Sequence, residues 1–297
     1  MINNNFTFND SCPVCNKVDK KQLFEINDYS IVQCKNCSLK YLDPLPEEKS
    51  IREIYQADYF SSTTDERGYK NYIFDEPLVK RTYKKRLLKV KNILRFEKDN
   101  VFRAHEAGCA YGFGLQIIQS IFPNCSLTAS DISKEAVNFC NKKGYEVYLS
   151  DLWGRTKELD LNSLDLLIMF DVIEHFRNIQ PFVYWASKVI KKGGFVILTT
   201  PDINSFFNRI LGKRSPSYKI PEHIIYFSKE TLSFAFRESF NLIRSFSDYQ
   251  IIRLDRMVTK IFRLLKLPIN LVDRAKILRL FNIWTPNGMR IYVFQKK

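Results

Sequence analysis

The sequence has 297 residues, of which 45% are hydrophobic and 26% are charged, values that exclude wholesale disorder, a collagen-like repeat and a small disulfide scaffold. The 46 Lys and Arg residues outnumber the 32 Asp and Glu residues, so the formal net charge is +14. This excess lies in residues 79–98 and 251–297, because the rest of the chain is nearly neutral. The chain has neither a long apolar run nor a signal-peptide pattern, so we expect a cytoplasmic protein without a transmembrane segment.

The first 45 residues contain two C-x-x-C pairs, formed by Cys12 with Cys15 and by Cys34 with Cys37. Each such turn can present two thiolates to one tetrahedral metal ion, and two turns complete the ligands of a structural Zn²⁺. A redox dithiol is disfavoured because neither pair begins a helix in a thioredoxin-like unit. We therefore predict a four-cysteine zinc ribbon over residues 1–45.

Residues 46–100 predict a helical connector or cap. A short helix is expected over 50–59 and a longer one over 76–96, in which apolar residues recur at helical spacing with basic residues between them. The basic stripe of the longer helix is typical of a solvated helix face.

From residue 101 onward, short apolar segments alternate with helical patterns, which is typical of a parallel sheet covered by helices on both faces. Strands are expected near 101–107, 125–130, 145–149, 164–170 and 195–200, and helices near 113–122, 133–143 and 179–191. Beyond them we expect a loop over 202–227, a helix over 228–239, a strand near 240–247, an amphipathic helix over 251–267 and a strand over 289–295. The predicted fold is an α/β, Rossmann-like, doubly wound, mostly parallel sheet over 101–297, with a reversed C-terminal edge strand and a helical insertion over 251–281.

Glycines and acids follow the first three predicted strands of this sheet. Gly108 and Gly112 lie in the loop that opens the first helix, and their spacing differs from that of a dinucleotide site. Asp131 ends the second strand, where an acid can accept hydrogen bonds from ribose hydroxyls, and Asp151 follows the third. Since ligands bind outside the carboxyl ends of strands in open α/β sheets, these residues predict one nucleoside-binding crevice.

The run Glu106-Ala-Gly-Cys-Ala-Tyr-Gly112, the acids Asp131 and Asp151, and the segment Phe170-Asp-Val-Ile-Glu-His175 resemble motifs of class I S-adenosylmethionine (SAM)-dependent methyltransferases. The resemblance covers about 101–297, and the zinc pairs resemble those of a bacterial subgroup found among sugar and surface-glycan methyltransferases. It implies a cofactor site made of Glu106, Gly108, Cys109, Ala110, Gly112, Asp131, Ile132, Asp151, Leu152, Phe170 and Asp171. In that site Asp131 holds the ribose and Asp151 faces the adenine. Ala110 is a departure, since the family more often has glycine there.

Methyl transfer to a hydroxyl group needs a base that removes the proton, and histidine is the commonest such group. His223 follows Glu222 in a segment that resembles the Glu-His motif of sugar C-methyltransferases, in which the histidine is the proposed base. We predict His223 as the base, with Glu222 orienting it, and His175 as the second candidate. His105, inside the first strand, is interpreted as structural.

The leading hypothesis is a zinc-containing SAM-dependent methyltransferase that acts on a sugar-like small molecule. The net charge keeps an RNA methyltransferase as an alternative, although the basic residues lie on two helices and not around the crevice. A non-catalytic zinc-ribbon binding module is a further alternative, disfavoured by the intact acids. The amphipathic helix over 251–267 could pack on the sheet or touch an anionic membrane surface, and the sequence does not separate these.

Overall fold

The computed structural model describes residues 11–26, 28–54, 73–94, 96, 101–151, 154–264, 267–268 and 276–297. Its main feature is a seven-stranded sheet with the order β10-β11-β8-β7-β4-β5-β6. Its strands are β4 (Phe102–Ala107), β5 (Cys125–Asp131), β6 (Glu146–Leu149), β7 (Leu164–Phe170), β8 (Ile190–Pro201), β10 (Phe240–Arg253) and β11 (Asn282–Lys296). The first five are parallel, and β11 is antiparallel to both β8 and β10. The predicted fold class is confirmed, and the reversed strand lies one place inside the edge formed by β10.

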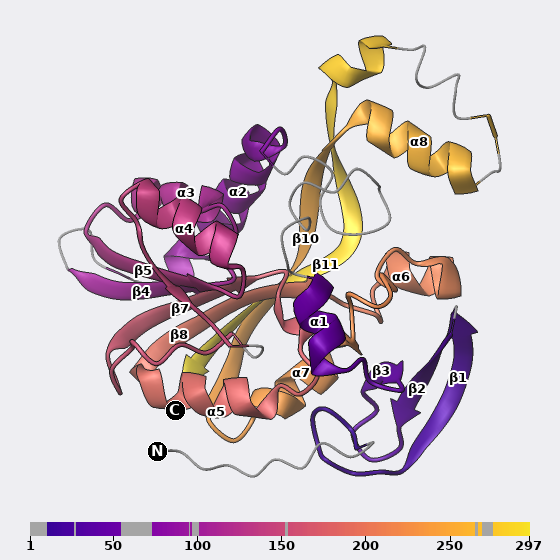
Figure 1. The fold of residues 1–297 in the computed structure, drawn as a ribbon, viewed down its shortest axis with the longest axis horizontal. Coiled ribbons are helices and arrows are strands. Elements are labelled where there is room, and N and C mark those ends of the chain that lie inside the picture. The colour runs from indigo at the N-terminus through magenta and orange to yellow at the C-terminus, as the bar shows by residue number, and fades with distance from the viewer. Residues whose placement is uncertain are drawn as a thin grey trace.

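Helices cover both faces of this sheet (Figure 1). One face carries α2 (Glu76–Leu94), α3 (Phe113–Ile121) and α4 (Lys134–Lys142), and the other carries α5 (Gln180–Val189) and α7 (Lys229–Phe236). Each of these helices begins within one residue of its predicted start, because apolar periodicity and N-capping serines mark the boundaries. Two separate apolar cores result, one under each layer of helices.

The N-terminal residues form a second, small sheet with the order β1-β2-β3-β9. Its strands are β1 (Lys20–Ile26), β2 (Tyr29–Cys34), β3 (Lys40–Asp43) and β9 (Ile225–Tyr226). These strands were not predicted from the sequence, because they are short and lack a clear alternation of apolar and polar residues. The small sheet shares the apolar core of the α5–α7 face, and β9 ties it to the second half of the chain.

Three predictions in the C-terminal half are wrong. The loop expected over 202–227 contains α6 (Phe206–Leu211), whose first turn is capped by the Ser205 hydroxyl. The strand expected near 240–247 continues to Arg253, because β10 and β11 stay paired well beyond the sheet. As a consequence, the next helix, α8 (Leu254–Leu264), begins three residues later than predicted.

The remaining helical turns are α1 (Glu48–Ile54), η1 (Ile173–His175), η2 (Gly212–Arg214) and η3 (Lys276–Leu280). The short helix predicted over 50–59 overlaps α1, and its second half lies outside the described residues. Within the described part of the chain, no helix is both long and apolar enough to cross a membrane.

Candidate functional site

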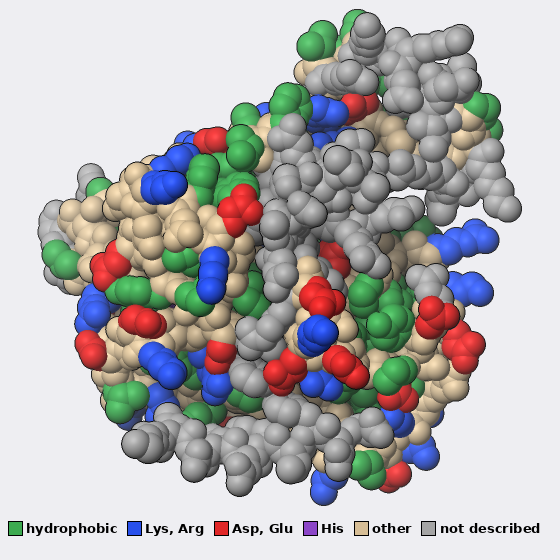
Figure 2. Space-filling view, in the orientation of Figure 1, with side chains coloured by type: hydrophobic (Ala, Val, Ile, Leu, Met, Phe, Trp, Pro, Cys, Tyr) green, Lys and Arg blue, Asp and Glu red, His purple; other side chains and the backbone are tan. Residues whose placement is uncertain are grey.

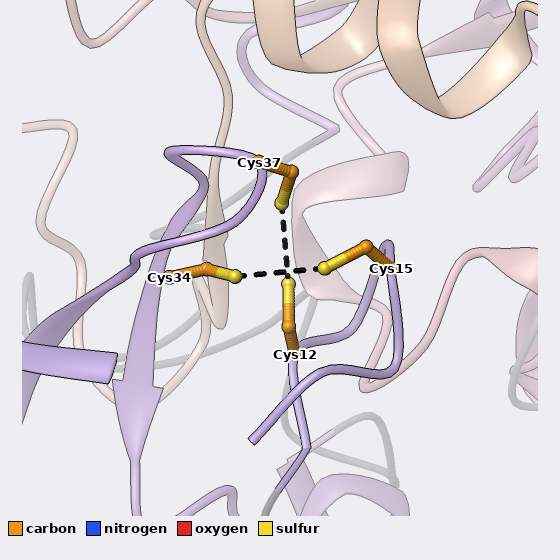
Figure 3. A group of neighbouring side chains, drawn as sticks. All are labelled: Cys12, Cys15, Cys34 and Cys37. Atoms are coloured by element: carbon orange, nitrogen blue, oxygen red, sulfur yellow. Dashed lines mark hydrogen bonds between the residues drawn. The ribbon is translucent and has the colours of Figure 1, made fainter. Parts of the chain in front are cut away.

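The four predicted zinc ligands converge on one point (Figure 3). The Sγ atoms of Cys12 and Cys37 lie 3.5 Å apart, as do those of Cys15 and Cys34, and all four lie within 4.8 Å of one another. These separations are too long for disulfides, and the cysteines are free. Zn–S bonds of about 2.3 Å in a tetrahedron place sulfurs about 3.8 Å apart, so the donor set fits Zn²⁺.

Both cysteine turns have the same backbone design. Cys12 N donates to the Lys17 carbonyl and Asn16 N donates to the Cys12 carbonyl, and the same two bonds recur from Cys34 and Ser38. Asn16 and Ser38 both have positive φ, which reverses the chain after the second cysteine of each pair. The two turns therefore have equivalent backbone structures, and their thiols point toward one another (Figure 3).

A cavity of about 230 Å³ lies at the carboxyl ends of β4, β5 and β7. Seven of the eleven predicted cofactor residues line it: Gly108, Ala110, Asp131, Ile132, Asp151, Phe170 and Asp171. Glu106, Cys109 and Gly112 are buried and do not line the cavity, and Leu152 lies outside the described residues. Further parts of the wall come from α2, from the end of β10 and from the start of α8, which the sequence did not connect with the crevice.

The glycine loop and Asp131 hold each other in place. The Asp131 carboxylate accepts hydrogen bonds from the backbone N–H of Ala110 at 2.8 Å and of Ser133 at 2.9 Å. Burial raises the pKa of Asp131, and these N–H groups oppose the shift. Gly108 has φ +80°, and a Cβ there would lie 2.4 Å from a Val172 methyl group, so only glycine fits at this turn.

Glu106 is fully buried beside Tyr83 of α2 and Gly114 of α3. Neither of its carboxylate oxygens has a hydrogen-bond partner of good geometry among the described residues. Burial raises the pKa of Glu106 to about 8, although the neighbouring Tyr83 hydroxyl opposes the shift. A buried carboxyl group without hydrogen-bond partners lowers the stability of the fold. Such groups are typical of binding sites, where a ligand can supply the partner.

Asp151 follows β6 and Asp171 follows β7, and β4 and β5 lie between these two strands in the sheet. Its carboxylate accepts hydrogen bonds from Arg155 Nε at 2.7 Å and from the Arg155 N–H at 2.9 Å. The Asp151 side chain is about one-third exposed, so water reaches this pair. A carboxylate at this position can accept a hydrogen bond from an exocyclic amino group.

Asp171 follows β7 in a left-handed conformation, with φ +60°. Its carboxylate accepts from the Thr199 hydroxyl at 2.6 Å and from the Arg86 guanidinium at 2.9 and 3.3 Å. Arg86 also donates to Asp248 of β10 at 2.8 Å and lies over the Phe170 ring. Burial alone would lower the pKa of Arg86, but Asp171 and Asp248 raise it further than burial lowers it. Arg86 was not predicted as a site residue, because it is one of many basic residues in α2 and these were interpreted as a solvated face.

The two candidate bases lie side by side. The His175 and His223 rings make an edge contact with their centroids 4.9 Å apart, and of the two only His175 lines the cavity. Each ring is oriented by a backbone carbonyl, because Nδ1 of His175 lies 2.7 Å from the Glu222 oxygen and Nδ1 of His223 lies 2.8 Å from the Ser217 oxygen. Carbonyls only accept, so these two bonds place the proton of each neutral ring on Nδ1. Burial lowers the pKa of His175 to about 4 and of His223 to about 3.

Glu222 and Glu174 lie next to this histidine pair. The Glu222 carboxylate is buried and forms an ion pair with Lys219 at 2.6 Å, while its carbonyl holds His175. Glu174 accepts from the Thr200 hydroxyl at 3.0 Å, and burial raises its pKa to about 8. Ligand-type atoms of Glu174, His175 and His223 lie within 4.8 Å of one another, so this cluster also has the donor set of a metal site.

His105 is placed as predicted, in the core and away from the cavity. Its two ring nitrogens contact the hydroxyls of Thr128 at 2.9 Å and Ser130 at 3.0 Å. Burial lowers its pKa to about 3. With both nitrogens satisfied inside the sheet, this histidine has a structural environment.

Comparison with known proteins agrees with this geometry. Residues 105–196 match the family model described as a methyltransferase domain. Over 96 residues the chain is 27% identical to malonyl-(acyl-carrier protein) O-methyltransferase of Priestia megaterium (strain DSM 319 / IMG 1521). That match covers 32% of this chain and 35% of the relative, so it spans about a third of the relative's length.

Two solved structures have a similar fold. A SAM-dependent methyltransferase from Thermotoga maritima aligns with a TM-score of 0.51 at 15% identity, covering 83% of this chain and 100% of its own. A chain from the complex that contains the Haloferax volcanii Trm112 methyltransferase activator aligns with a TM-score of 0.52 at 13% identity, covering 75% and 93%. The fold is therefore that of class I methyltransferases. This fold and the match of residues 105–196 to a methyltransferase domain together support the assignment of the chain as a SAM-dependent methyltransferase.

Proposed function

We propose that this protein transfers a methyl group from SAM to a hydroxyl group of a sugar-like small molecule, with the pair His175 and His223 as the base. The observation that carries the proposal is the position of His175, which lines the same cavity as Asp171 and is in contact with His223. When bound, SAM supplies a methyl group on a sulfonium, which is a good leaving group. The protein therefore needs to align the acceptor and remove its proton.

The cofactor would be held by residues at the carboxyl ends of β4, β5 and β6. Asp131 accepts the ribose hydroxyls, Asp151 accepts from the adenine amino group, and the loop of Gly108 and Ala110 lies along the methionine part. The buried acid Asp131 and the closely packed turn at Gly108 support this assignment.

Both rings of the histidine pair are unprotonated at neutral pH, which is the state that a general base requires. Because the pKa values of both rings lie near 3 to 4, both are neutral at pH 7. His175, which lines the cavity, receives the acceptor proton, and His223 is in edge contact with it. The carbonyl oxygens of Glu222 and Ser217 keep each ring in the required tautomer.

A hydroxylated acceptor agrees with the polar groups of the cavity wall. Asp75, which precedes α2, pairs through Oδ2 with Arg256 of α8 at 2.5 Å. Its Oδ1 is buried and has no hydrogen-bond partner among the residues that the structure describes. A hydroxyl group of the acceptor would satisfy this oxygen, whereas an apolar acceptor would leave it unpaired. The Glu222-His223 motif and the zinc pairs, which resemble those of sugar methyltransferases, point to the same substrate class.

We also propose that the four cysteines bind one structural Zn²⁺. With all four positions filled by protein thiolates, the ion has no open site for chemistry. Its role is to hold β2 and β3, and β3 pairs with β9 directly after His223.

The experiment that tests this function compares His175→Asn and His223→Asn with His105→Asn as the matched control. Asparagine keeps a donor near the Nδ1 position and removes the basic nitrogen. Transfer of labelled methyl from SAM to a panel of nucleotide-linked sugars should fall about 10²–10⁴-fold in the first two variants. Their affinity for S-adenosylhomocysteine should stay within twofold of the parent.

Turnover of the parent protein should also lack the usual histidine inflection near pH 6.5, because the low pKa values keep both rings neutral down to about pH 4. Full turnover of both asparagine variants would remove the histidine pair from the mechanism. An equal loss in His105→Asn would show that the effect is only structural.

A further inference from the structure

The C-terminal extension, which we define by its described residues 251–264, 267–268 and 276–284, leaves the body of the molecule. The strands β10 and β11 stay paired from Ile251 with Trp284 to Arg253 with Asn282, and α8 and η3 follow at the tip. In Figure 1 this extension rises away from the central sheet. In this extension α8 contacts η3 and β10, the edge strand that continues out of the sheet.

Large apolar side chains are exposed at the tip of this extension. Ile277 and Leu280 of η3 are 64% and 76% exposed, and Phe281, Ile261 and Leu267 are about half exposed. In Figure 2 several hydrophobic side chains are visible on the surface of this extension. Scattered exposed leucines are ordinary, but several on one projecting element indicate an interaction surface.

The charge of the extension indicates what this surface contacts. From residue 251 to residue 281 the sequence carries eight Lys or Arg residues against two Asp residues. One of these acids, Asp255, is already paired with Arg253. An amphipathic helix with exposed aliphatic and aromatic residues among basic ones is typical of elements that lie in the interface of an anionic bilayer.

A second patch of the same kind lies on α6, on the same side of the molecule in Figure 1. Phe206 and Ile210 are 81% and 67% exposed and are one helical turn apart. Arg209, Lys213 and Arg214 are exposed beside them. Two apolar and basic patches on one side favour a broad, flat, anionic partner over a narrow one.

We propose that the C-terminal extension docks this protein on a membrane surface that contains anionic lipids, with α6 as a second contact. RNA is a poorer fit, because nucleic acid sites combine positive charge with aromatic stacking and do not need exposed Ile and Leu. The inference is independent of the proposed function, because lipid binding requires neither SAM nor an acceptor.

The test is co-sedimentation of the purified full-length protein with phosphatidylcholine vesicles that contain or lack phosphatidylglycerol. The variant Ile277→Glu/Leu280→Glu removes two apolar contacts and adds two negative charges at the tip. The matched control is Val101→Glu/Leu161→Glu, since these residues are 77% and 70% exposed and precede β4 and β7, at the opposite end of the strands from the cavity. Both variants change the charge equally and lie on the surface.

The parent protein and the control should bind the anionic vesicles equally well. The tip variant should bind them at least about tenfold more weakly, because both the apolar insertion and the attraction to lipid are reduced. The absence of binding by the parent, or an equal loss in the control, would overturn the proposal. Binding to RNA without binding to vesicles, or dimerisation that the tip variant abolishes, would assign the surface to a nucleic acid or to a second copy.

Discussion

Replacement of Arg86 by methionine removes the cation that links the helix and the strands next to the cavity. Arg86 is the cation between Asp171 and Asp248, and it joins α2 to the ends of β7 and β10. Methionine fills a similar volume but leaves both carboxylates without their cation. The Asp171 side chain is 35% exposed and keeps its bond from Thr199, so water can relieve that charge. The Asp248 side chain is only 2% exposed, so most of the cost arises there.

We expect Arg86→Met to lower the free energy of unfolding by about 3–5 kcal/mol, the usual cost of removing one partner of a buried ion pair. The variant Asp171→Asn should cost only about 1 kcal/mol, as is common for pairs that water can reach. The double variant Arg86→Met/Asp248→Leu should recover most of the loss, because an apolar pair needs no compensation.

Urea unfolding followed by circular dichroism, with linear extrapolation to water, measures these differences. The m-value must stay constant across the series, since a change would indicate a different unfolding transition. A loss below 1 kcal/mol for Arg86→Met, or a double variant no more stable than the single one, would refute the reasoning.

Three further predictions address other parts of the site. Because burial raises the Glu106 pKa from 4.5 to about 8, the folded state holds the proton more tightly than the unfolded chain, and the free energy of unfolding should fall as pH rises from about 4.5 through 8. Glu106→Gln should remove this fall and be more stable than the parent at pH 9 in thermal unfolding; an unchanged pH profile would contradict the buried state of Glu106. Cys34→Ser should reduce the zinc content measured by mass spectrometry from one ion per chain to a small fraction, whereas Cys125→Ser, outside the cluster, should keep it; retention in both would reject the site. Asp75→Asn should raise KM for the acceptor about tenfold, because it removes one hydrogen bond to a charged group. The affinity for S-adenosylhomocysteine should be unchanged. If only that affinity changes, Asp75 belongs to the cofactor site.

The central sheet could be predicted because its signals are local. Strand β7 has the predicted bounds 164–170, since its apolar residues, interrupted only by Asp165, are bounded by Ser163 and Asp171. The positions of Asp131 and Asp151 on one cavity follow from a general rule, because the carboxyl ends of parallel strands meet at one edge. The clustering of the four cysteines follows in the same way from the spacing of the two pairs.

Features that depend on distant pairing could not be predicted. Strand β9 has only two residues, and it exists because Ile225 pairs with Tyr41 of the N-terminal sheet. The role of Arg86 depends on Asp248, which is 162 residues away in the chain. Periodicity within a window cannot detect such contacts, so a buried cation was interpreted as part of a solvated stripe.

The C-terminal extension was mispredicted for a related reason. Residues 251–253 have helical spacing in the sequence, yet they continue β10, because the cross-strand partners 282–284 are available. Tertiary pairing overrides a weak local preference in this case.

Calorimetric titration of the parent protein with S-adenosylhomocysteine, with NAD as control ligand, tests whether the cavity binds SAM. We expect one micromolar site per chain for S-adenosylhomocysteine, no site for NAD, and at least about a tenfold loss of affinity in Asp131→Ala, because two hydrogen bonds to ribose are removed. A folded, zinc-loaded protein that binds neither ligand would contradict the assignment and favour a non-catalytic binding module.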